Sequence, residues 1–293
     1  MKPLFQRPFR KSPKETTNIS LSENTTTSNL SEKLIMPPFT TAFAQSKGLQ
    51  RDHNEDALFT LTSFSAMQDA TRPFGIFAVA DGMGGHLHGE IASKLAVSSV
   101  ASLIVERILS PYVNPSLQNP PNSLQSLLRE AVMTAHQEVL KFATGGGTTL
   151  TICLLLGSFL TIAHVGDSRV YYIDPNGEIK LFTRDHSLVK RLVELGQISE
   201  KEAATHPQRN VLYRALGQGE PLEPDIISLP LPHNGTLLLC TDGLWSVVPE
   251  QKIIQLIHQS ENLQNACTEL IEAANQAGGP DNISVILVKF NEE

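Results

Sequence analysis

The 293-residue sequence has few of the features that mark membrane proteins and nucleic-acid-binding proteins. It contains no uncharged apolar stretch of about 18 residues, the length that a membrane helix needs. The best candidate, 91–109, is interrupted by Lys94, Glu106 and Arg107. Lys and Arg number 23 against 30 Asp and Glu, which gives a net charge of −7, and no basic patch stands out. We therefore expect no membrane insertion and no nucleic-acid partner.

Cysteine is also scarce. The chain has only Cys153, Cys240 and Cys267, an odd number at wide spacings, and two of them lie inside apolar runs. This pattern argues against a disulfide framework and against a zinc site, and it is typical of reduced thiols in the core of a cytoplasmic protein. We therefore expect a cytoplasmic location.

The first 37 residues differ from the rest of the chain. Residues 1–37 are rich in Ser, Thr, Asn and Pro and show little hydrophobic periodicity, so we expect a disordered tail. The basic residues among the first fourteen fit either a transit peptide or a solvated tail, and we favour the tail. From residue 38 onward the apolar pattern is regular. With 41% hydrophobic residues overall, we expect one folded domain over 38–293.

Apolar runs and turn signals predict the secondary structure of that domain. Strands are expected at 39–45, 56–62, 74–80, 149–156, 159–165, 170–173, 179–182, 236–240 and 283–290. Helices are expected at 88–109, 123–143 and 249–276, with a mixed polar and helical region at 186–217. In the first helix, one apolar face would hold Ile91, Leu95, Val100, Ile104 and Ile108. Strands joined by hairpins, followed by long helices, predict an α+β fold. Its two antiparallel β-sheets pack face to face as a sandwich flanked by helices, in four α-β-β-α layers.

Four carboxylates lie at the edges of apolar strands: Asp56, Asp81, Asp242 and Asp281. An Asp-Gly pair is a common turn and by itself needs no function. However, Asp81 is followed by Gly84 and Gly85 in addition to Gly82, and a turn does not require these extra glycines. Likewise, Gly-Gly-Pro precedes Asp281. Such glycines permit unusual backbone angles and close approach of a ligand to the main chain.

Sheets packed face to face can bring several strand ends to one rim. Carboxylates gathered there would repel one another unless a cation lay between them. Oxygen ligands select hard ions such as Mg²⁺ or Mn²⁺, and no nearby cluster of Cys and His indicates zinc. The sequence therefore predicts a site for a hard divalent cation.

Seven short motifs occur in a fixed order along the chain. They are G-x-x-R-x-x-N-E-D from Gly48, VADGMGG from Val79, GTT, GDSR, RALG, TDGLW and GGPDNIS. The ordered set resembles the metal-dependent type-2C (PPM) family of serine/threonine protein phosphatases in its bacterial form, over about residues 38–290. The resemblance implies hydrolysis of phosphoserine and phosphothreonine by a water activated on two Mn²⁺ or Mg²⁺ ions. It also implies phosphorylated proteins as partners, a serine/threonine kinase among them, and we expect a monomer.

The resemblance assigns metal-binding roles to five residues. Asp81 would bridge both ions, and Gly82 would offer its backbone carbonyl. Asp242 and Asp281 would hold the first ion. Asp56 would serve the second ion directly or through waters, with support from the neighbouring Glu55.

The remaining roles are less uniform. Arg51 is the expected catalytic residue, because a guanidinium can grip two phosphate oxygens, although a solvated surface arginine is the alternative. Some family members bind a third ion near the acid that matches Asp167, which could equally hold a turn, and the sequence leaves both open. Met83 stands where many eukaryotic members have a histidine that protonates the leaving group. His86 and His88 lie nearby without a reason to place them in reach, so no general acid is assigned.

The region 186–217 resembles a flap beside the active site in bacterial relatives. Its residues His186, His206 and Arg209 either touch substrate or support the fold, and we favour support for each. Trp245 is interpreted as core packing next to Asp242.

Other functions remain as alternatives. The Cys-x₅-Arg motif of cysteine phosphatases, the Asp-x-Asp of haloacid dehalogenases and a P-loop are all absent from the sequence. Two readings compete with a protein phosphatase: an enzyme acting on small phosphate esters, and a non-catalytic module that binds phosphoproteins. Such a module should have lost metal-binding acids, whereas this chain keeps them all.

Overall fold

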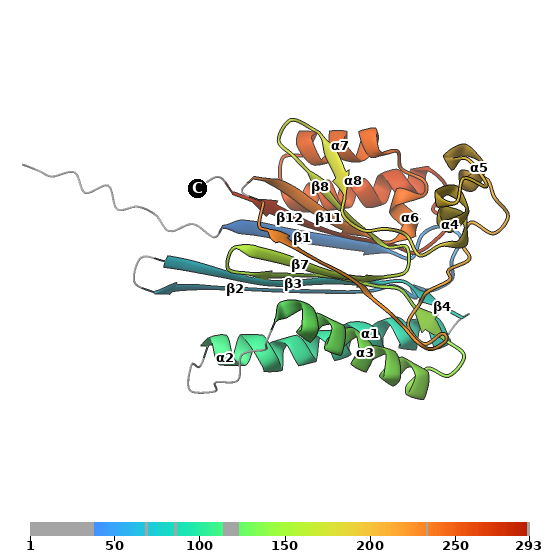
Figure 1. Cartoon of the computed structure of the whole chain (residues 1–293). Helices are drawn as coiled ribbons and strands as arrows, with labels where there is room; N and C mark the ends of the chain where they lie inside the picture. The colour runs from blue at the N-terminus through green and yellow to red at the C-terminus, as the bar shows by residue number, and fades with distance from the viewer. Residues whose placement is uncertain (1–37, 68–69, 85–86, 114–122, 233, 292–293) are drawn as a thin grey trace, which may run out of the picture. The chain divides into compact units, whose positions relative to one another are not determined.

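Two antiparallel sheets of five strands each form the centre of the fold (Figure 1). The structure is a computed structural model and describes residues 38–67, 70–84, 87–113, 123–232 and 234–291. These residues fall within a unit that extends from Ile35 to Glu293. The predicted tail at 1–37 and His86 lie outside the described residues.

The strands follow one another in an order that differs from their order in the chain. The first sheet runs β1 (Phe39–Ser46), β12 (Ile283–Phe290), β11 (Gly235–Cys240), β8 (Arg169–Ile173) and β9 (Ile179–Leu181). The second runs β10 (Asp225–Pro230), β7 (Phe159–Val165), β6 (Leu150–Leu156), β3 (Ala70–Ala80) and β2 (Ala57–Met67). A small third sheet pairs β4 (Gly82–Met83) with β5 (Gly147–Thr148).

The inner faces of the two large sheets pack against each other. Side chains alternate along a strand, so every second residue of β3, β6, β11 and β12 faces the opposite sheet. Phe77 and Val79 of one sheet share a buried cluster with Leu237 and Val288 of the other. The prediction of a sandwich is confirmed.

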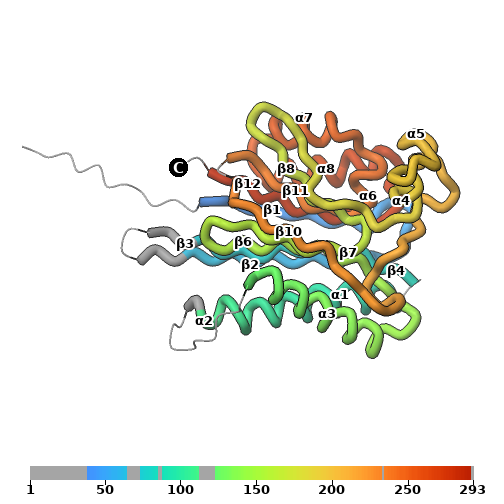
Figure 2. The backbone as a smooth tube through the Cα atoms, in the orientation of Figure 1, coloured from blue at the N-terminus to red at the C-terminus, as the bar shows by residue number. Residues whose placement is uncertain are grey.

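Helices cover the two outer faces (Figures 1 and 2). The second sheet packs on α1 (Leu87–Ile104) and α3 (Leu124–Phe142), and α1 continues through a π-helical turn, Val105–Leu109, into α2 (Ser110–Val113). The first sheet packs on α7 (Glu250–Gln259) and α8 (Leu263–Gln276). The layer order α-β-β-α is therefore as predicted.

Some predicted elements differ in detail. The helix predicted at 249–276 is two helices, because the Asn262 side chain accepts a hydrogen bond from Asn265 N at 2.9 Å and begins α8 there. Ile91, predicted on the buried face of α1, is 41% exposed. Strand β10 was not predicted, and neither was the short helix α6 (Asp242–Trp245). The region 186–217 contains two short helices, α4 (Leu188–Glu194) and α5 (Glu200–Ala204).

The three cysteines are buried and unpaired, as expected of core thiols. Within the described ranges, none of the helices combines the length and the apolar character that crossing a membrane requires.

Candidate active site

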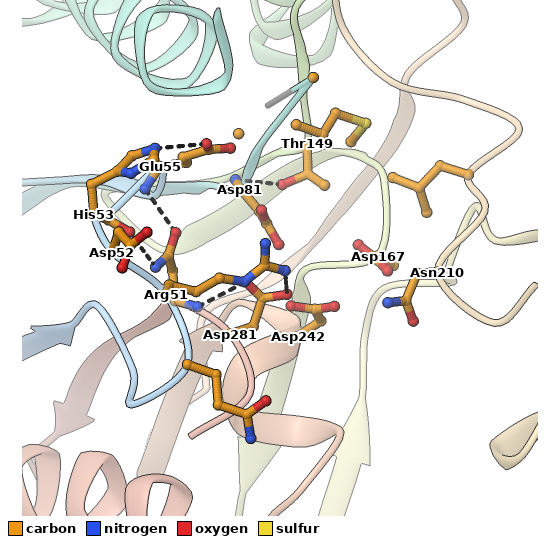
Figure 3. Close-up of a pocket in the computed structure, with 16 residues that line it drawn as sticks. Arg51, Asp52, His53, Glu55, Asp81, Thr149, Asp167, Asn210, Asp242 and Asp281 are labelled. Carbon is orange, nitrogen blue, oxygen red and sulfur yellow. Dashed lines mark hydrogen bonds and ion pairs between the residues drawn. The ribbon is translucent and has the colours of Figure 1, made fainter. Parts of the chain in front are cut away.

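Strand ends from both sheets meet around a hollow of about 450 Å³. It is lined by the loop before β2, the end of β3, the turns after β11 and before β12, and part of the segment after α5. Figure 3 shows Asp81, Asp242 and Asp281 pointing toward the same space, with Asp167 across from them. Three carboxylates predicted from separate motifs are thus brought together.

The end of β3 is fixed by the GTT motif. Asp81 N donates to Thr149 Oγ1 at 2.8 Å, and Thr149 N donates back to the Asp81 carbonyl at 2.9 Å. The Thr148 hydroxyl donates to the same carbonyl, also at 2.9 Å. These bonds hold the backbone of Asp81 and leave its carboxylate free to face the hollow.

Gly82 follows Asp81 at a crowded point of the backbone. Its φ angle is not positive, so conformational freedom does not explain the glycine. A Cβ atom there would instead clash with the carbonyls of Gly89 and Glu55. Because glycine has no side chain, β4, the start of α1 and the loop before β2 can pack closely together next to Asp81.

Asp242 and Asp281 are neighbours because β11 and β12 are paired antiparallel strands. Asp242 follows the end of β11, and Asp281 precedes the start of β12. The two turns are in close contact, since a side chain at Gly243 would collide with the backbone carbonyl of Asn282.

Asn282 fastens the loop before β2 to this pair of turns. Its amide nitrogen donates to the carbonyls of Lys47 and His53, each at 2.9 Å, and its Oδ1 accepts from Glu55 N at 2.7 Å. We predicted no role for Asn282, although it lies inside the last motif. Asn282 explains how the loop bearing Arg51 and Glu55 is held beside Asp281.

Asp56 and Glu55 face opposite sides of the chain, as adjacent residues entering a strand do. Glu55 lines the hollow, and its Oε1 is 2.9 Å from His53 Nε2. Asp56 is 5% exposed and lies behind the hollow, where its Oδ2 accepts from Thr241 Oγ1 at 2.9 Å and from Ser284 Oγ at 2.6 Å. The structure therefore gives Glu55, rather than Asp56, the direct access to the hollow.

The crowded acids have raised pKa values. Burial raises the pKa of Asp56 to about 7, against two hydrogen bonds that lower it. Burial, followed by repulsion from Asp281, raises the pKa of Asp242 to about 6. The pKa values of Asp81 and Asp167 lie well above the ordinary range, first through burial and then through the charge of Asp242. Acids in this state favour a bound cation.

The donor set fits hard divalent cations. Asp56 Oδ1 and Asp242 Oδ1 are buried without a hydrogen-bond partner in the described structure. Asp81, Asp242, Asp281 and Glu55 all line the hollow, and carboxylate oxygens are the ligands that Mg²⁺ and Mn²⁺ prefer. In the described part of the chain, however, no three His, Cys, Asp or Glu side chains lie in an arrangement that could hold a metal ion as they stand.

Arg51 occupies part of this space. Its guanidinium donates to Asp281 Oδ2 at 2.7 Å, and its side chain is 51% exposed at the mouth of the hollow. The predicted phosphate-binding arginine is therefore next to the acids and is paired with one of them.

Of the other candidate residues, some line the hollow and others do not. Asp167 and Met83 line the hollow. The carbonyl of Asp167 also accepts from Trp245 Nε1 at 3.0 Å, so Trp245 supports this turn. His88 is exposed and does not line the hollow.

The flap residues predicted as support lie away from the lining. His206 and Arg209 are not part of it. His186 is buried, accepts from Gly166 N at 3.1 Å and lies 3.2 Å from an Asp225 carboxylate oxygen. Sequence reasoning gave no role to the lining residues Gln50, Asp52, His53, Asn282, Asn210 and Leu212. Asn210 and Leu212 could have been suggested by their position within the region 186–217, which resembles a flap beside the active site.

A family model described as "Protein phosphatase 2C" matches residues 42–283. The chain belongs to the protein phosphatase 2C family. It is 36% identical over 252 residues to a protein named "Serine/threonine phosphatase stp" from Listeria innocua, a match that covers 85% of this chain and 95% of that protein. The family assignment drawn from the ordered motifs is confirmed.

Solved structures of protein phosphatase 2C relatives share the fold. The Mycobacterium tuberculosis serine/threonine phosphatase PstP/Ppp matches with a TM-score of 0.71 and 32% identity, over 87% of this chain and 99% of that one. The catalytic domain of PstP in complex with two manganese ions matches with a TM-score of 0.69 and 31% identity. That match covers 86% of this chain and 97% of the PstP domain.

Proposed function

We propose that this chain hydrolyses phosphoserine and phosphothreonine in proteins with two Mn²⁺ or Mg²⁺ ions held at the hollow. The observation that carries the proposal is the convergence of Asp81, Asp242 and Asp281, from both sheets, beside Arg51. Membership of the protein phosphatase 2C family and the two manganese ions in the related PstP structure support it.

The residues would divide the two ions between them. Asp81 would contact both, Asp242 and Asp281 the first, and the Gly82 carbonyl the second. Glu55 would support the second ion from the lining, and Asp56 would do so from behind it. When bound, the ions lower the pKa of a water molecule to near neutrality and offset the charge of the phosphate.

Arg51 orients the substrate in this proposal. A guanidinium forms two parallel hydrogen bonds to phosphate oxygens. Because half of the Arg51 side chain is exposed, it can turn from Asp281 Oδ2 to a phosphate at the mouth without a change in the backbone. Met83 lines the hollow and has no proton to donate, so no side chain is assigned as the acid that protonates the leaving oxygen.

Asp167 is the acid that would hold a third ion. Its carboxylate lines the hollow on the side that faces Asn210, and the pKa of this acid is raised by burial and by Asp242. A cation beside Asp167 would relieve the repulsion between these two acids.

The substrate class follows from the site. The hollow is open enough at its mouth to expose Arg51 and Asp281, as a phosphorylated side chain on a protein requires. The physiological substrates are phosphoproteins, and a serine/threonine kinase that makes them is the expected partner. We also propose that the folded domain acts as a cytoplasmic monomer.

The test compares phosphoserine, phosphothreonine and phosphotyrosine peptides with and without Mn²⁺. The expected result is turnover of the first two, loss of turnover in EDTA and recovery with Mn²⁺. Activity indifferent to EDTA would contradict the metal mechanism. Turnover of small phosphate esters alone would favour the small-ester enzyme, and tight phosphopeptide binding without turnover would favour the non-catalytic module.

A further inference from the structure

The edge strand β2 lacks the usual protection against pairing with another strand. It lies at the edge of the second sheet and pairs with β3 alone among the described strands. Its eleven residues, ALFTLTSFSAM, include no charged residue and no proline. Exposed edges normally carry lysine, proline or a bulge, or are very short, because their free N–H and C=O groups invite a further strand.

The other edges of the two sheets are protected. Strand β10 begins with Asp225 and ends with Pro230, and β9 has three residues with Lys180 in the middle. At β1, the Phe43 carbonyl accepts a hydrogen bond from the Gln264 side chain of α8 at 3.0 Å. Among these edges, β2 is the longest strand without a charged residue or a proline.

A groove of about 510 Å³ lies between β2 and α1. On the strand side it is lined by Leu58 and Phe59, and on the helix side by Val97, Ala101 and Ser102. Small residues on the helix leave room for side chains of a strand placed beside β2. Since the helix side combines apolar side chains with serine hydroxyls, a neutral, partly apolar segment fits it.

The groove begins close in the chain to the lining of the hollow. It begins at Ala57, which directly follows Glu55 and Asp56. The Ser93 hydroxyl of α1 donates to the Glu55 carbonyl at 2.5 Å, so the start of the groove is tied to the lining of the hollow. Lys94, paired with Glu90, marks this end of the groove.

We infer that the groove between β2 and α1 binds an extended segment of the phosphoprotein substrate, which adds to the sheet as a strand beside β2. The inference rests on the proposed function. Backbone hydrogen bonds to the edge would give affinity, and alternate side chains that enter the groove would give specificity. The preferred segment is neutral, with apolar residues at every second position. Because Ala57 of the groove lies two residues from Glu55 of the active-site lining, a substrate segment is favoured over a second copy of the chain.

The experiment uses a short phosphothreonine peptide with three kinds of tail. One peptide has no tail, one carries about eight residues of alternating Val and Thr, and one carries a Gly-Ser tail of equal length. Each tail is placed on either side of the phosphothreonine. The alternating tail is expected to raise kcat/KM at least about fivefold over the Gly-Ser tail, through a lower KM, from one of the two sides.

Two variants locate the effect. Ser102→Glu places a charge in the groove on an exposed position of α1, and it should remove the advantage of the alternating tail while leaving the untailed peptide unchanged. Thr134→Glu adds the same charge at an exposed position of α3, outside the groove, and should keep the advantage. Hydrogen exchange should show slower exchange of the β2 amides when the alternating-tail peptide is bound.

Several results would overturn the inference. These are equal kcat/KM for all tails, an advantage that survives Ser102→Glu, or unchanged exchange in β2. A dimer that Ser102→Glu dissociates, without any effect of the tail, would assign the edge to a second copy. Failure of the proposed function would look different, because then the untailed peptide would not be turned over either.

Discussion

At the scale of single residues, the site depends on carboxyl groups that repel one another. Asp81, Asp167 and Asp242 lie close together, and the charge of Asp242 raises the pKa values of both Asp81 and Asp167. Such a cluster destabilises the ion-free protein and strengthens cation binding. The acids proposed to bind the ions thus lower the free energy of unfolding when no ion is bound.

The first prediction concerns Asp242. Asp242→Asn should lower the turnover of a phosphothreonine peptide at least about a thousandfold, because a ligand of the ions is lost. Since the variant removes one of the mutually repelling charges, it should unfold in EDTA at the same temperature as the wild type or higher. Turnover and thermal unfolding measured on the same preparation check this. Full activity of a folded variant would refute the site.

The second prediction concerns pH. Protons compete with cations for acids whose pKa values are raised, to about 7 for Asp56 and about 6 for Asp242. Mn²⁺ affinity should therefore rise steeply from about pH 5.5 to 7.5, with protons released on binding at the lower pH. Calorimetry in two buffers of different ionisation enthalpy counts those protons. A pH-independent affinity would contradict the raised pKa values.

Without bound ions, the stability of the folded protein should fall as pH rises, whereas Mn²⁺ affinity should increase. An acid with a raised pKa holds its proton more tightly in the folded state. Its contribution to the free energy of unfolding is present below the unfolded value near 3.8 and is lost as pH rises through the folded value near 6 or 7. In EDTA, these acids should therefore make the protein less stable toward neutral pH, and Mn²⁺ should stabilise it most there.

The sequence predicted which acids matter, but not how each one faces. Asp81, Asp242 and Asp281 could be selected because each adjoins an apolar strand and a glycine. Whether Glu55 or Asp56 faces the hollow depends on the residue at which β2 leaves the loop, which a pattern cannot locate to within one position. Asn282 was missed because its partners are backbone groups of a segment more than 200 residues away in the chain.

At the scale of elements, close contact between turns holds the acids in place. Gly243, at the start of α6, lies against the carbonyl of Asn282 just before β12. This contact aligns the turns that carry Asp242 and Asp281.

The third prediction tests that contact. Gly243→Ala should lower the free energy of unfolding by about 2–3 kcal/mol and weaken Mn²⁺ binding, because the backbone must shift to admit the methyl group. Gly157→Ala is the matched control. Gly157 has φ +58° and nothing within 4 Å of an added Cβ, so it should cost only about 1 kcal/mol. Urea unfolding and calorimetry measure both, and equal effects on Mn²⁺ binding would contradict the role of the contact.

Local signals explain which elements could be predicted. The β6–β7 hairpin follows from the two-residue Gly157-Ser158 link, and the register pairs Leu156 with Phe159. The break between α7 and α8 depends on one capping bond of Asn262, which weakens the helical pattern very little. Strand β10 was missed because it is an edge strand with few buried side chains, so its alternation is indistinct.

At the scale of the whole domain, the ligands come from both sheets. Asp81 belongs to the end of β3 in the second sheet, whereas Asp242 and Asp281 adjoin β11 and β12 in the first. Ions bound between them would join the two halves of the sandwich at one rim.

The fourth prediction follows from that bridge. At a free Mn²⁺ concentration of 100 times Kd, each site adds about 2.7 kcal/mol to the free energy of unfolding. For a domain of this size, Tm should rise by about 5–10 °C per site. Thermal unfolding with and without Mn²⁺ measures the shift, and Asp242→Asn should lose most of it. An unchanged Tm at saturating Mn²⁺ would mean that the rim binds no ion.

The central claim is that carboxylates from both sheets hold two divalent ions in the hollow. Anomalous diffraction at the manganese absorption edge, from crystals grown with Mn²⁺, tests it most directly. We predict two strong peaks in the hollow, both within bonding distance of Asp81 and one also within bonding distance of Asp242 and Asp281. Peaks elsewhere, or none at these acids, would contradict the account.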